Sequence, residues 1–261
     1  MKTVFALSLL LLSSSALAAV IGKDVRYQAG ESSMKGYLAY DDAIKGKRPG
    51  VLVVPEWWGT NDYARKRARM LASEGYVALA VDMYGNGQVA RTPKEAGALA
   101  GGINKNPPLA YARMDAARRF LEGQPNVKKG EIAALGYCFG GGVVLNMARA
   151  GMPLKSVASY HGVLVSDVGV KPGEVIKAKI RVFHGEADPI VPPEQVEAFK
   201  AEMANAQADY MLLAYPGVKH TFTNREADSY AAQFNLPLKY DPEADADSWT
   251  RTLEFLKATL N

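Results

Sequence analysis

Short apolar runs alternate with amphipathic segments along most of this 261-residue chain. Residues 50–55 read Gly-Val-Leu-Val-Val-Pro, a β-branched run typical of a strand buried on both faces. Further runs predict strands at residues 76–81, 131–135, 156–160, 180–183 and 210–214, beside the one at 50–55. Two short extended segments at residues 23–28 and 35–40, with Gly30 between them, predict a hairpin. Helical periodicity predicts helices at residues 61–74, 107–122, 140–150, 193–204 and 242–260. This alternation predicts an α/β fold, with a mostly parallel central sheet, helices on both of its faces, and functional groups at the carboxyl ends of its strands.

The first eighteen residues have the pattern of a secretory signal peptide. Lys2 gives a positive start, residues 4–12 are apolar apart from Ser8, and residues 16–18 read Ala-Leu-Ala, which fits a cleavage site. The apolar run is too short to span a membrane. We therefore expect a signal peptide at residues 1–18 and one domain at residues 19–261. The mature protein is expected to be periplasmic or secreted, without stable membrane association.

Charge and motif content argue against several other classes. The formal net charge is only +4, so the sequence indicates no nucleic-acid partner. A basic cluster at residues 65–69 is interpreted as the solvated face of a helix. No zinc spacing such as H-E-x-x-H occurs, and the acidic residues 241–247 are interpreted as the start of the last helix. We expect neither a metal nor another cofactor.

Cys138 is the only cysteine, so it cannot form an internal disulfide even in an oxidising compartment. It is the central residue of the segment 136–140, Gly-Tyr-Cys-Phe-Gly, which follows an apolar strand and precedes an apolar helix. That context is typical of a nucleophile elbow. The helix N-terminus favours a thiolate, and the N–H of Phe139 is placed to donate to an oxyanion.

The residues expected to assist the nucleophile follow later in the chain. Asp188 comes after the strand at residues 180–183, and His220 comes after the strand at residues 210–214. Nucleophile, acid and histidine then occur in the order typical of the α/β-hydrolase fold. His220 is the candidate base, and Asp188 would orient its ring.

Rival residues stay open beside this assignment. Glu186 is an alternative acid because it lies two residues before Asp188. His184 ends a predicted strand and is interpreted as a structural residue. His161 also follows a strand, and it either lines the pocket or is structural.

The chain resembles the dienelactone hydrolases, also called carboxymethylenebutenolidases. The resemblance rests on five segments, at residues 55–59, 82–84, 136–141, 184–192 and 220–222. It implies that Glu56 contacts the cysteine and switches it between resting and reactive states. It also implies that the N–H of Trp57 is the second oxyanion donor. Residues expected near the substrate are Trp58, Tyr84, Asn86, His161, Phe222 and Asn224.

Two positions depart from the family pattern. Members that act on dienelactones carry arginines there, which grip the substrate carboxylate, whereas this chain has Asn86 and Asn224. Arg91 or Arg225 could take over that role. Loss of bidentate recognition should weaken binding of an anionic lactone.

The resulting hypothesis is an enzyme that hydrolyses a small ester or lactone through Cys138, His220 and Asp188. A general carboxylesterase or thioesterase with a neutral substrate is the first alternative. A thiol redox protein is the second, and it would use Cys138 without His220. A non-catalytic binding protein is disfavoured because every member of the triad is present.

Overall fold

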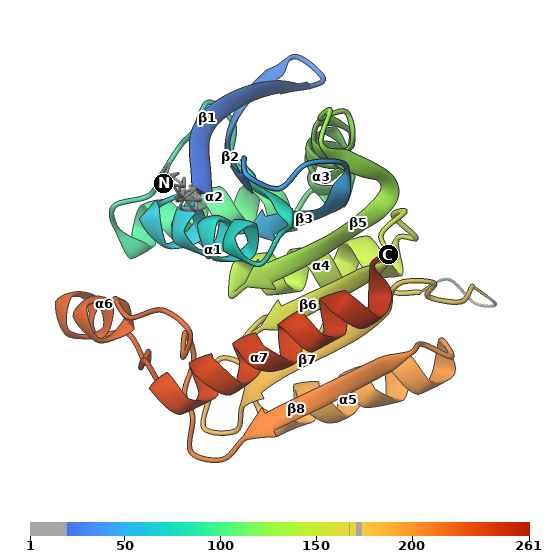
Figure 1. Ribbon diagram of the computed structural model, residues 1–261. Coiled ribbons are helices and arrows are strands. Elements are labelled where there is room, and N and C mark those ends of the chain that lie inside the picture. Colours follow the sequence, from blue (N-terminus) through green and yellow to red (C-terminus); the bar gives the residue numbers. More distant parts are fainter. Residues whose placement is uncertain (1–19, 167, 171–173) are drawn as a thin grey trace, which may run out of the picture.

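The computed structural model describes residues 20–166, 168–170 and 174–261 (Figure 1). The predicted signal peptide at residues 1–18 lies outside these residues. The strands are β1 (Val20–Ala29), β2 (Ser32–Asp41), β3 (Arg48–Val54), β4 (Val77–Ala80), β5 (Val127–Tyr137), β6 (Ser156–Tyr160), β7 (Lys179–Gly185) and β8 (Tyr210–Tyr215). The helices are α1 (Asp62–Ser73), α2 (Pro93–Asn104), α3 (Pro107–Glu122), α4 (Phe139–Arg149), α5 (Pro193–Asn205), α6 (Ala227–Phe234) and α7 (Pro242–Thr259).

The strands form one sheet in the order β1-β2-β4-β3-β5-β6-β7-β8. β1 and β2 form an antiparallel hairpin, and β2 pairs antiparallel with β4. All the pairs from β4 to β8 are parallel. The predicted mostly parallel α/β sheet is therefore confirmed.

Helices cover both faces of this sheet, which buries the central strands completely. In β3, Leu52 and Val54 belong to a core cluster shared with α3, α4 and α5. Val51 and Val53 face the opposite cluster, which α1 and α7 complete. Figure 1 shows α7 lying across β6 and β7. Burial of both faces explains why the strand sequence is apolar throughout rather than alternating.

Two helices were not predicted. α2 contains Gly97, Gly101 and Gly102, which lower helix propensity and hide its periodicity. Its start is nevertheless capped, because the Thr92 side chain accepts from the N–H of Glu95. α6 has only eight residues.

The loops that follow the parallel strands all lie at one edge of the sheet, as the carboxyl ends of parallel strands must. These loops carry the residues that the sequence singled out: Glu56 after β3, Cys138 after β5, His161 after β6, Asp188 after β7 and His220 after β8. Chain segments far apart in sequence therefore meet at this edge.

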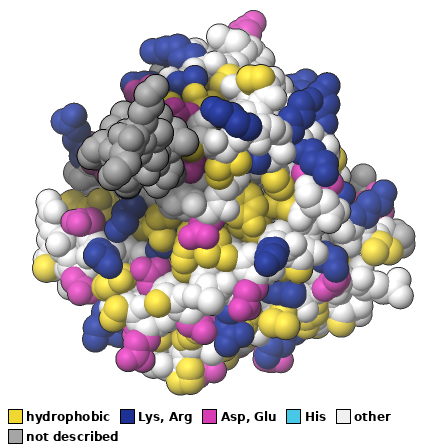
Figure 2. Space-filling view, viewed as in Figure 1, with side chains coloured by type: hydrophobic (Ala, Val, Ile, Leu, Met, Phe, Trp, Pro, Cys, Tyr) yellow, Lys and Arg dark blue, Asp and Glu magenta, His cyan; other side chains and the backbone are white. Residues whose placement is uncertain are grey.

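The face that carries α7 has mixed charge. Figure 2 shows Lys and Arg side chains mixed with Asp and Glu over the face that carries α7. Within the described ranges, no helix is both long enough and apolar enough to span a bilayer.

Candidate active site

Cys138 occupies a strained backbone position between β5 and α4, with φ +53° and ψ −116°. Non-glycine residues rarely adopt positive φ, and where they do the surrounding structure must hold them there. Two acceptors share the N–H of Cys138. They are the carbonyl oxygen of Tyr160 at 3.0 Å and Nδ1 of His161 at 3.1 Å. The N–H of Gly141 donates to the Cys138 carbonyl at 2.9 Å and starts the helix.

The two flanking glycines allow this turn because backbone packs directly on backbone. A Cβ atom at Gly136 would lie 2.0 Å from the carbonyl oxygen of Gly140. A Cβ at Gly140 would lie 2.3 Å from the carbonyl oxygen of Val54. No side chain fits in either place, so the Gly-x-Cys-x-Gly pattern has a steric origin.

His220 and Asp188 form a close buried pair. Nδ1 of His220 lies 2.6 Å from Oδ2 of Asp188, and Oδ1 of Asp188 accepts from the N–H of Ile190 at 2.8 Å. This places the ring proton on Nδ1. Nε2 is buried, and no described residue hydrogen-bonds it, which leaves this nitrogen free for a proton-transfer role. Burial alone would lower the pKa of His220, but Cys138 and Asp188 together raise it to about 10. The site therefore favours an imidazolium beside the sulfur.

The loops after β7 and β8 are joined to each other, which fixes this pair. The N–H of Ala187 donates to the carbonyl of Val218 at 3.0 Å. A Cβ at Gly185 would lie 2.4 Å from the same carbonyl oxygen, so only glycine permits the contact. Glu186 is exposed in this loop, whereas Asp188 is buried against His220. His184 is buried at the end of β7.

Glu56 is 2% exposed and accepts a hydrogen bond at Oε2 from Nδ2 of Asn224, at 2.7 Å. Its Oε1 atom is also buried, and no residue in the described part of the chain hydrogen-bonds it. Burial raises the pKa of Glu56 to about 7, against the opposing effects of Asn224 and His220. The carboxyl group can therefore gain or lose a proton near neutral pH.

The loop that carries Trp57 is tied to the elbow and to the loop after β4. The N–H of Gly140 donates to the Pro55 carbonyl at 3.1 Å, and the hydroxyl of Tyr84 donates to the Trp57 carbonyl at 2.9 Å. The N–H of Phe139 is the first of α4 and has no acceptor within the helix. The candidate oxyanion donors Trp57 and Phe139 thus lie on segments that hydrogen bonds hold together.

The residues predicted to line a substrate pocket occupy different environments. Tyr84 packs against Phe139 with ring centroids 5.8 Å apart. Trp58 is buried and stacks on Tyr230 of α6 at 4.7 Å. Phe222 is fully buried and packs edge-on against His161 at 5.2 Å.

The two asparagines at the positions where the resemblance implies arginines also differ from each other. Asn86 is exposed, and its N–H donates to the Ser33 carbonyl at 2.7 Å. Asn224 is buried and directed at Glu56. The exposed guanidinium of Arg225 lies over the ring of Tyr240, 5.9 Å from its centroid.

Asp82 has a structural role that its sequence motif did not reveal. Its carboxylate accepts four backbone N–H groups, which fix the loop after β4 and its contact with β2. The donors are Lys35, Tyr84, Gly85 and Gly87, at 2.8 to 2.9 Å. The Asp-x-Tyr segment therefore builds the wall beside Cys138 and places Tyr84.

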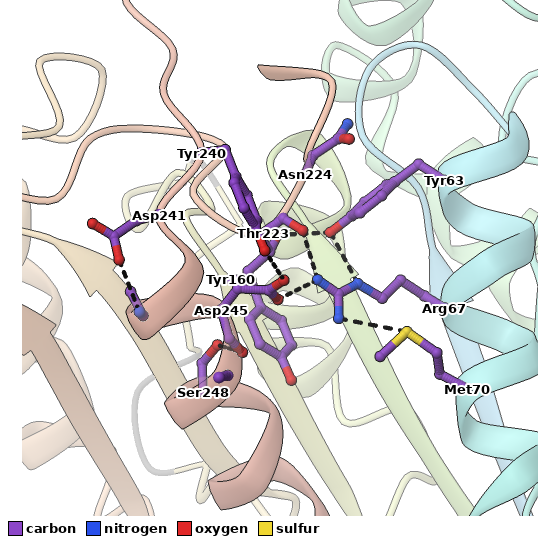
Figure 3. A network of polar contacts seen from close by, with 12 residues as sticks. Tyr63, Arg67, Met70, Tyr160, Thr223, Asn224, Tyr240, Asp241, Asp245 and Ser248 are labelled. Carbon is purple, nitrogen blue, oxygen red and sulfur yellow. Dashed lines mark hydrogen bonds and ion pairs between the residues drawn. The ribbon is translucent and has the colours of Figure 1, made fainter. Parts of the chain in front are cut away.

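Arg67 corrects the interpretation of the basic cluster. Lys66 and Arg69 are exposed as expected, but Arg67 is only 4% exposed. Its guanidinium donates to the Thr223 carbonyl at 2.6 Å and forms an ion pair with Asp245 (Figure 3). Nothing in the local sequence distinguished Arg67 from its neighbours, because its acceptors come from distant segments.

Known proteins identify the family of this chain. The sequence profile of the dienelactone hydrolase family matches residues 34–260. The chain belongs to this family. A Synechocystis sp. protein named "Putative carboxymethylenebutenolidase" is 27% identical over 241 residues, which cover 86% of this chain and 92% of that protein. A Bradyrhizobium sp. protein named "Probable 2-oxo-3-(5-oxofuran-2-ylidene)propanoate lactonase" is 29% identical over 236 residues. These residues cover 87% of this chain and 90% of that protein.

Solved structures agree with this assignment. A dienelactone hydrolase-like promiscuous phosphotriesterase from metagenomic libraries superposes with a TM-score of 0.85 at 33% identity, covering 93% of this chain and all of that one. The structure of a "Putative Dienelactone Hydrolase" from Klebsiella pneumoniae has a TM-score of 0.76 at 23% identity. The match covers 92% of this chain and 99% of that one, and it supports the fold alone. This dienelactone hydrolase-like protein is a hydrolase of ester or lactone bonds.

The described residues contain no group of three or more His, Cys, Asp or Glu side chains arranged to hold a metal ion. The candidate site consists of side chains and backbone N–H groups. This set is suited to acyl transfer.

Proposed function

We propose that this protein hydrolyses small esters or lactones through a triad of Cys138, His220 and Asp188. One arrangement carries the proposal. Asp188 binds Nδ1 of a buried His220, whose other nitrogen is left to a cysteine on a strained turn at a helix N-terminus. A base oriented by a carboxylate and a nucleophile at a helix N-terminus are the components of an activated nucleophile, and their presence here supports the proposal.

In the proposed reaction, the Cys138 thiolate attacks the carbonyl carbon of the ester. The N–H groups of Trp57 and Phe139 stabilise the oxyanion, an effect typically worth about 2.7–4 kcal/mol per donor. The tetrahedral intermediate collapses to a thioester, and the imidazolium of His220 gives its proton to the departing alkoxide. His220 then takes a proton from water, which attacks the thioester, and the acid leaves as the thiolate returns.

Glu56 is proposed as the group that exchanges a proton with the site as substrate enters. Its partner is the neutral amide of Asn224, and burial keeps its pKa at about 7. The resemblance implies an arginine at the position of Asn224, and an amide there offers a substrate carboxylate no bidentate cationic partner. We therefore infer that neutral esters and lactones are accepted beside anionic ones, and that the substrate need not carry a carboxylate.

The test is a hydrolysis panel of anionic dienelactones and neutral aryl and alkyl esters. Cys138→Ala should lose turnover of every substrate by at least about 10³-fold, because the nucleophile is gone. Wild-type kcat/KM for the neutral esters should equal or exceed that for the dienelactones. Activity retained in folded Cys138→Ala would reject the triad, and a strict preference for the anionic substrates would reject the inferred substrate range.

His220→Ala separates this function from a thiol redox protein. Ester hydrolysis should fall with loss of the base, whereas reduction of a peroxide or disulfide by Cys138 alone would survive. Redox activity that survives in His220→Ala, together with no esterase activity in wild type, would favour the redox alternative.

Phosphotriester cleavage is a second candidate activity of the same site. The 33% identical structural relative is named a promiscuous phosphotriesterase. Attack of the thiolate on phosphorus would expel an alkoxide or phenoxide and leave a phosphorothiolate, which water must cleave. Release of phenoxide from an aryl phosphotriester by wild type, and none by Cys138→Ala, would support it.

We also propose that the protein is exported, on the signal-peptide pattern of residues 1–18. Intact-mass analysis of a periplasmic fraction should find a chain that begins near Ala19. A full-length cytoplasmic chain would contradict export.

A further inference from the structure

His161 has both ring nitrogens engaged although it is not a member of the triad. It follows β6, has φ +40° and is 1% exposed. Nδ1 lies 3.1 Å from the backbone nitrogen of Cys138, and Nε2 lies 2.9 Å from Oγ1 of Thr223. The ring therefore joins the nucleophile turn to the segment that carries His220.

These two contacts determine the tautomer. The backbone N–H of Cys138 can only donate, so Nδ1 of His161 must be an unprotonated acceptor. The proton then resides on Nε2 and is directed at Thr223. Burial, the nearby His220 ring and Arg67 lower the pKa of His161 well below its usual range. A cationic ring would direct an Nδ1–H at the Cys138 N–H and destroy the contact.

The Thr223 end of the ring is anchored by a buried network. The hydroxyl of Thr223 lies 2.6 Å from the hydroxyl of Tyr63, which accepts from Nε of Arg67 at 3.3 Å. Arg67 also binds the Thr223 carbonyl and Asp245. Figure 3 shows the guanidinium directed at Thr223 and Asp245, with the Tyr63 hydroxyl beside it. Thr223 is thus held from its hydroxyl and its carbonyl.

We propose that His161 is a positioning residue that holds the backbone of Cys138 for catalysis. Its acceptor nitrogen shares the Cys138 N–H with the Tyr160 carbonyl, and together they hold the strained turn. The turn orients both the sulfur and the next peptide, whose N–H at Phe139 is the proposed oxyanion donor. The inference rests on the proposed function. It adds a role for a side chain whose ring nitrogens contact the Cys138 backbone and Thr223.

Two amide substitutions separate the two ends of the ring. In His161→Asn, Oδ1 takes the place of Nδ1 and can still accept from the Cys138 N–H, but nothing reaches Thr223. In His161→Gln, the amide reaches the place of Nε2 and can hydrogen-bond the Thr223 hydroxyl. No acceptor then remains at the Nδ1 position for the Cys138 N–H. His161→Phe keeps the ring shape without either nitrogen.

We expect His161→Asn to keep kcat within about 3-fold of wild type. His161→Gln and His161→Phe should each lose about 10- to 100-fold in kcat with little change in KM, because a displaced reacting group costs rate rather than binding. The pH profile of Cys138 alkylation by iodoacetamide should shift in His161→Gln and in His161→Phe. It should stay as in wild type in His161→Asn.

The matched control is Val157→Ala, a buried change in β6, the strand that precedes His161. It should lower Tm without moving the alkylation profile or kcat per active site. Equal losses in His161→Asn and His161→Gln, or full kcat in His161→Phe, would overturn the inference. If His161→Phe fails to fold, the comparison of kcat between His161→Asn and His161→Gln still tests the inference.

Cys138→Ala is assayed in the same experiment so that the proposed triad and the proposed role of His161 can be rejected independently. Activity surviving in Cys138→Ala would reject the proposed triad. An inactive Cys138→Ala, combined with unaltered kcat in both His161→Gln and His161→Phe, would reject only the role of His161.

Discussion

At the scale of single residues, burial sets the properties of the groups around Cys138. Glu56 and His161 are both withdrawn from solvent, yet their environments act in opposite directions on proton affinity. The pKa of Glu56 is raised to about 7, whereas the pKa of His161 is lowered well below its usual range. In both residues the buried site disfavours the charged form.

Glu56→Gln should change how stability depends on pH. In the folded protein Glu56 keeps its proton up to about pH 7, while in the unfolded chain it loses the proton near 4.5. Between these values the folded state binds more protons, so this group's stabilisation is full below about pH 4.5 and is lost as pH rises toward 7. The loss amounts to about 3 kcal/mol.

Urea unfolding of wild type and Glu56→Gln at several pH values measures this effect. The stability of wild type relative to the variant should fall between pH 4.5 and 7, and other titrating groups cancel in the difference. A difference that stays constant, or that rises with pH, would contradict a raised pKa at Glu56.

At the scale of elements, the turn between β5 and α4 depends on backbone contacts that admit no side chain. Gly140 lies against the carbonyl groups of Val54 and Pro55, which belong to the end of β3 and the loop after it. Two neighbouring parallel strands and one helix therefore meet at this glycine.

Gly140→Ala should disrupt the turn. Its Cβ would lie 2.3 Å from the Val54 carbonyl oxygen, so strand or helix must shift. We expect a loss of stability of at least about 2 kcal/mol and near-complete loss of activity. Gly142→Ala is the matched control on the same helix, because its nearest contact would be an ordinary 3.4 Å. It should be neutral or stabilise the helix by up to about 1 kcal/mol. Equal effects of the two changes in thermal unfolding would refute the steric explanation.

Much of this architecture was predictable from sequence because it depends on local patterns. The β-branched run at residues 50–55 and the apolar runs like it predicted the parallel strands, and the elbow motif placed Cys138 between strand and helix. Arg67 could not be recognised, since its partners Thr223 and Asp245 are more than a hundred residues away in sequence. The Asn224–Glu56 contact is equally non-local.

At the scale of the whole molecule, α7 joins distant parts of the chain across the face of the sheet. The ion pair of Asp245 with Arg67 connects it to α1. The Ser156 hydroxyl lies 2.8 Å from the hydroxyl of Thr259, and Tyr160 bonds Thr252. The last helix therefore stabilises both the sheet and the segment beside His220.

Asp245→Asn should destabilise the protein by about 2–4 kcal/mol, because it leaves the buried guanidinium of Arg67 without its counter-charge. Glu197→Gln, in an exposed pair with Lys200, should leave the free energy of unfolding nearly unchanged, because solvent screens such pairs. Chemical unfolding of both variants measures the difference. Similar small changes in the two would show that the Arg67 pair contributes little.

The arrangement of the strand ends also limits when activity can appear during folding. Glu56, Cys138 and His220 come from the start, middle and end of the chain, and the sheet inserts β3 between β4 and β5. A nascent chain lacks the proposed base, His220, until β8 has emerged and docked. Esterase activity should therefore return in a single late phase of refolding, later than the recovery of helical circular dichroism.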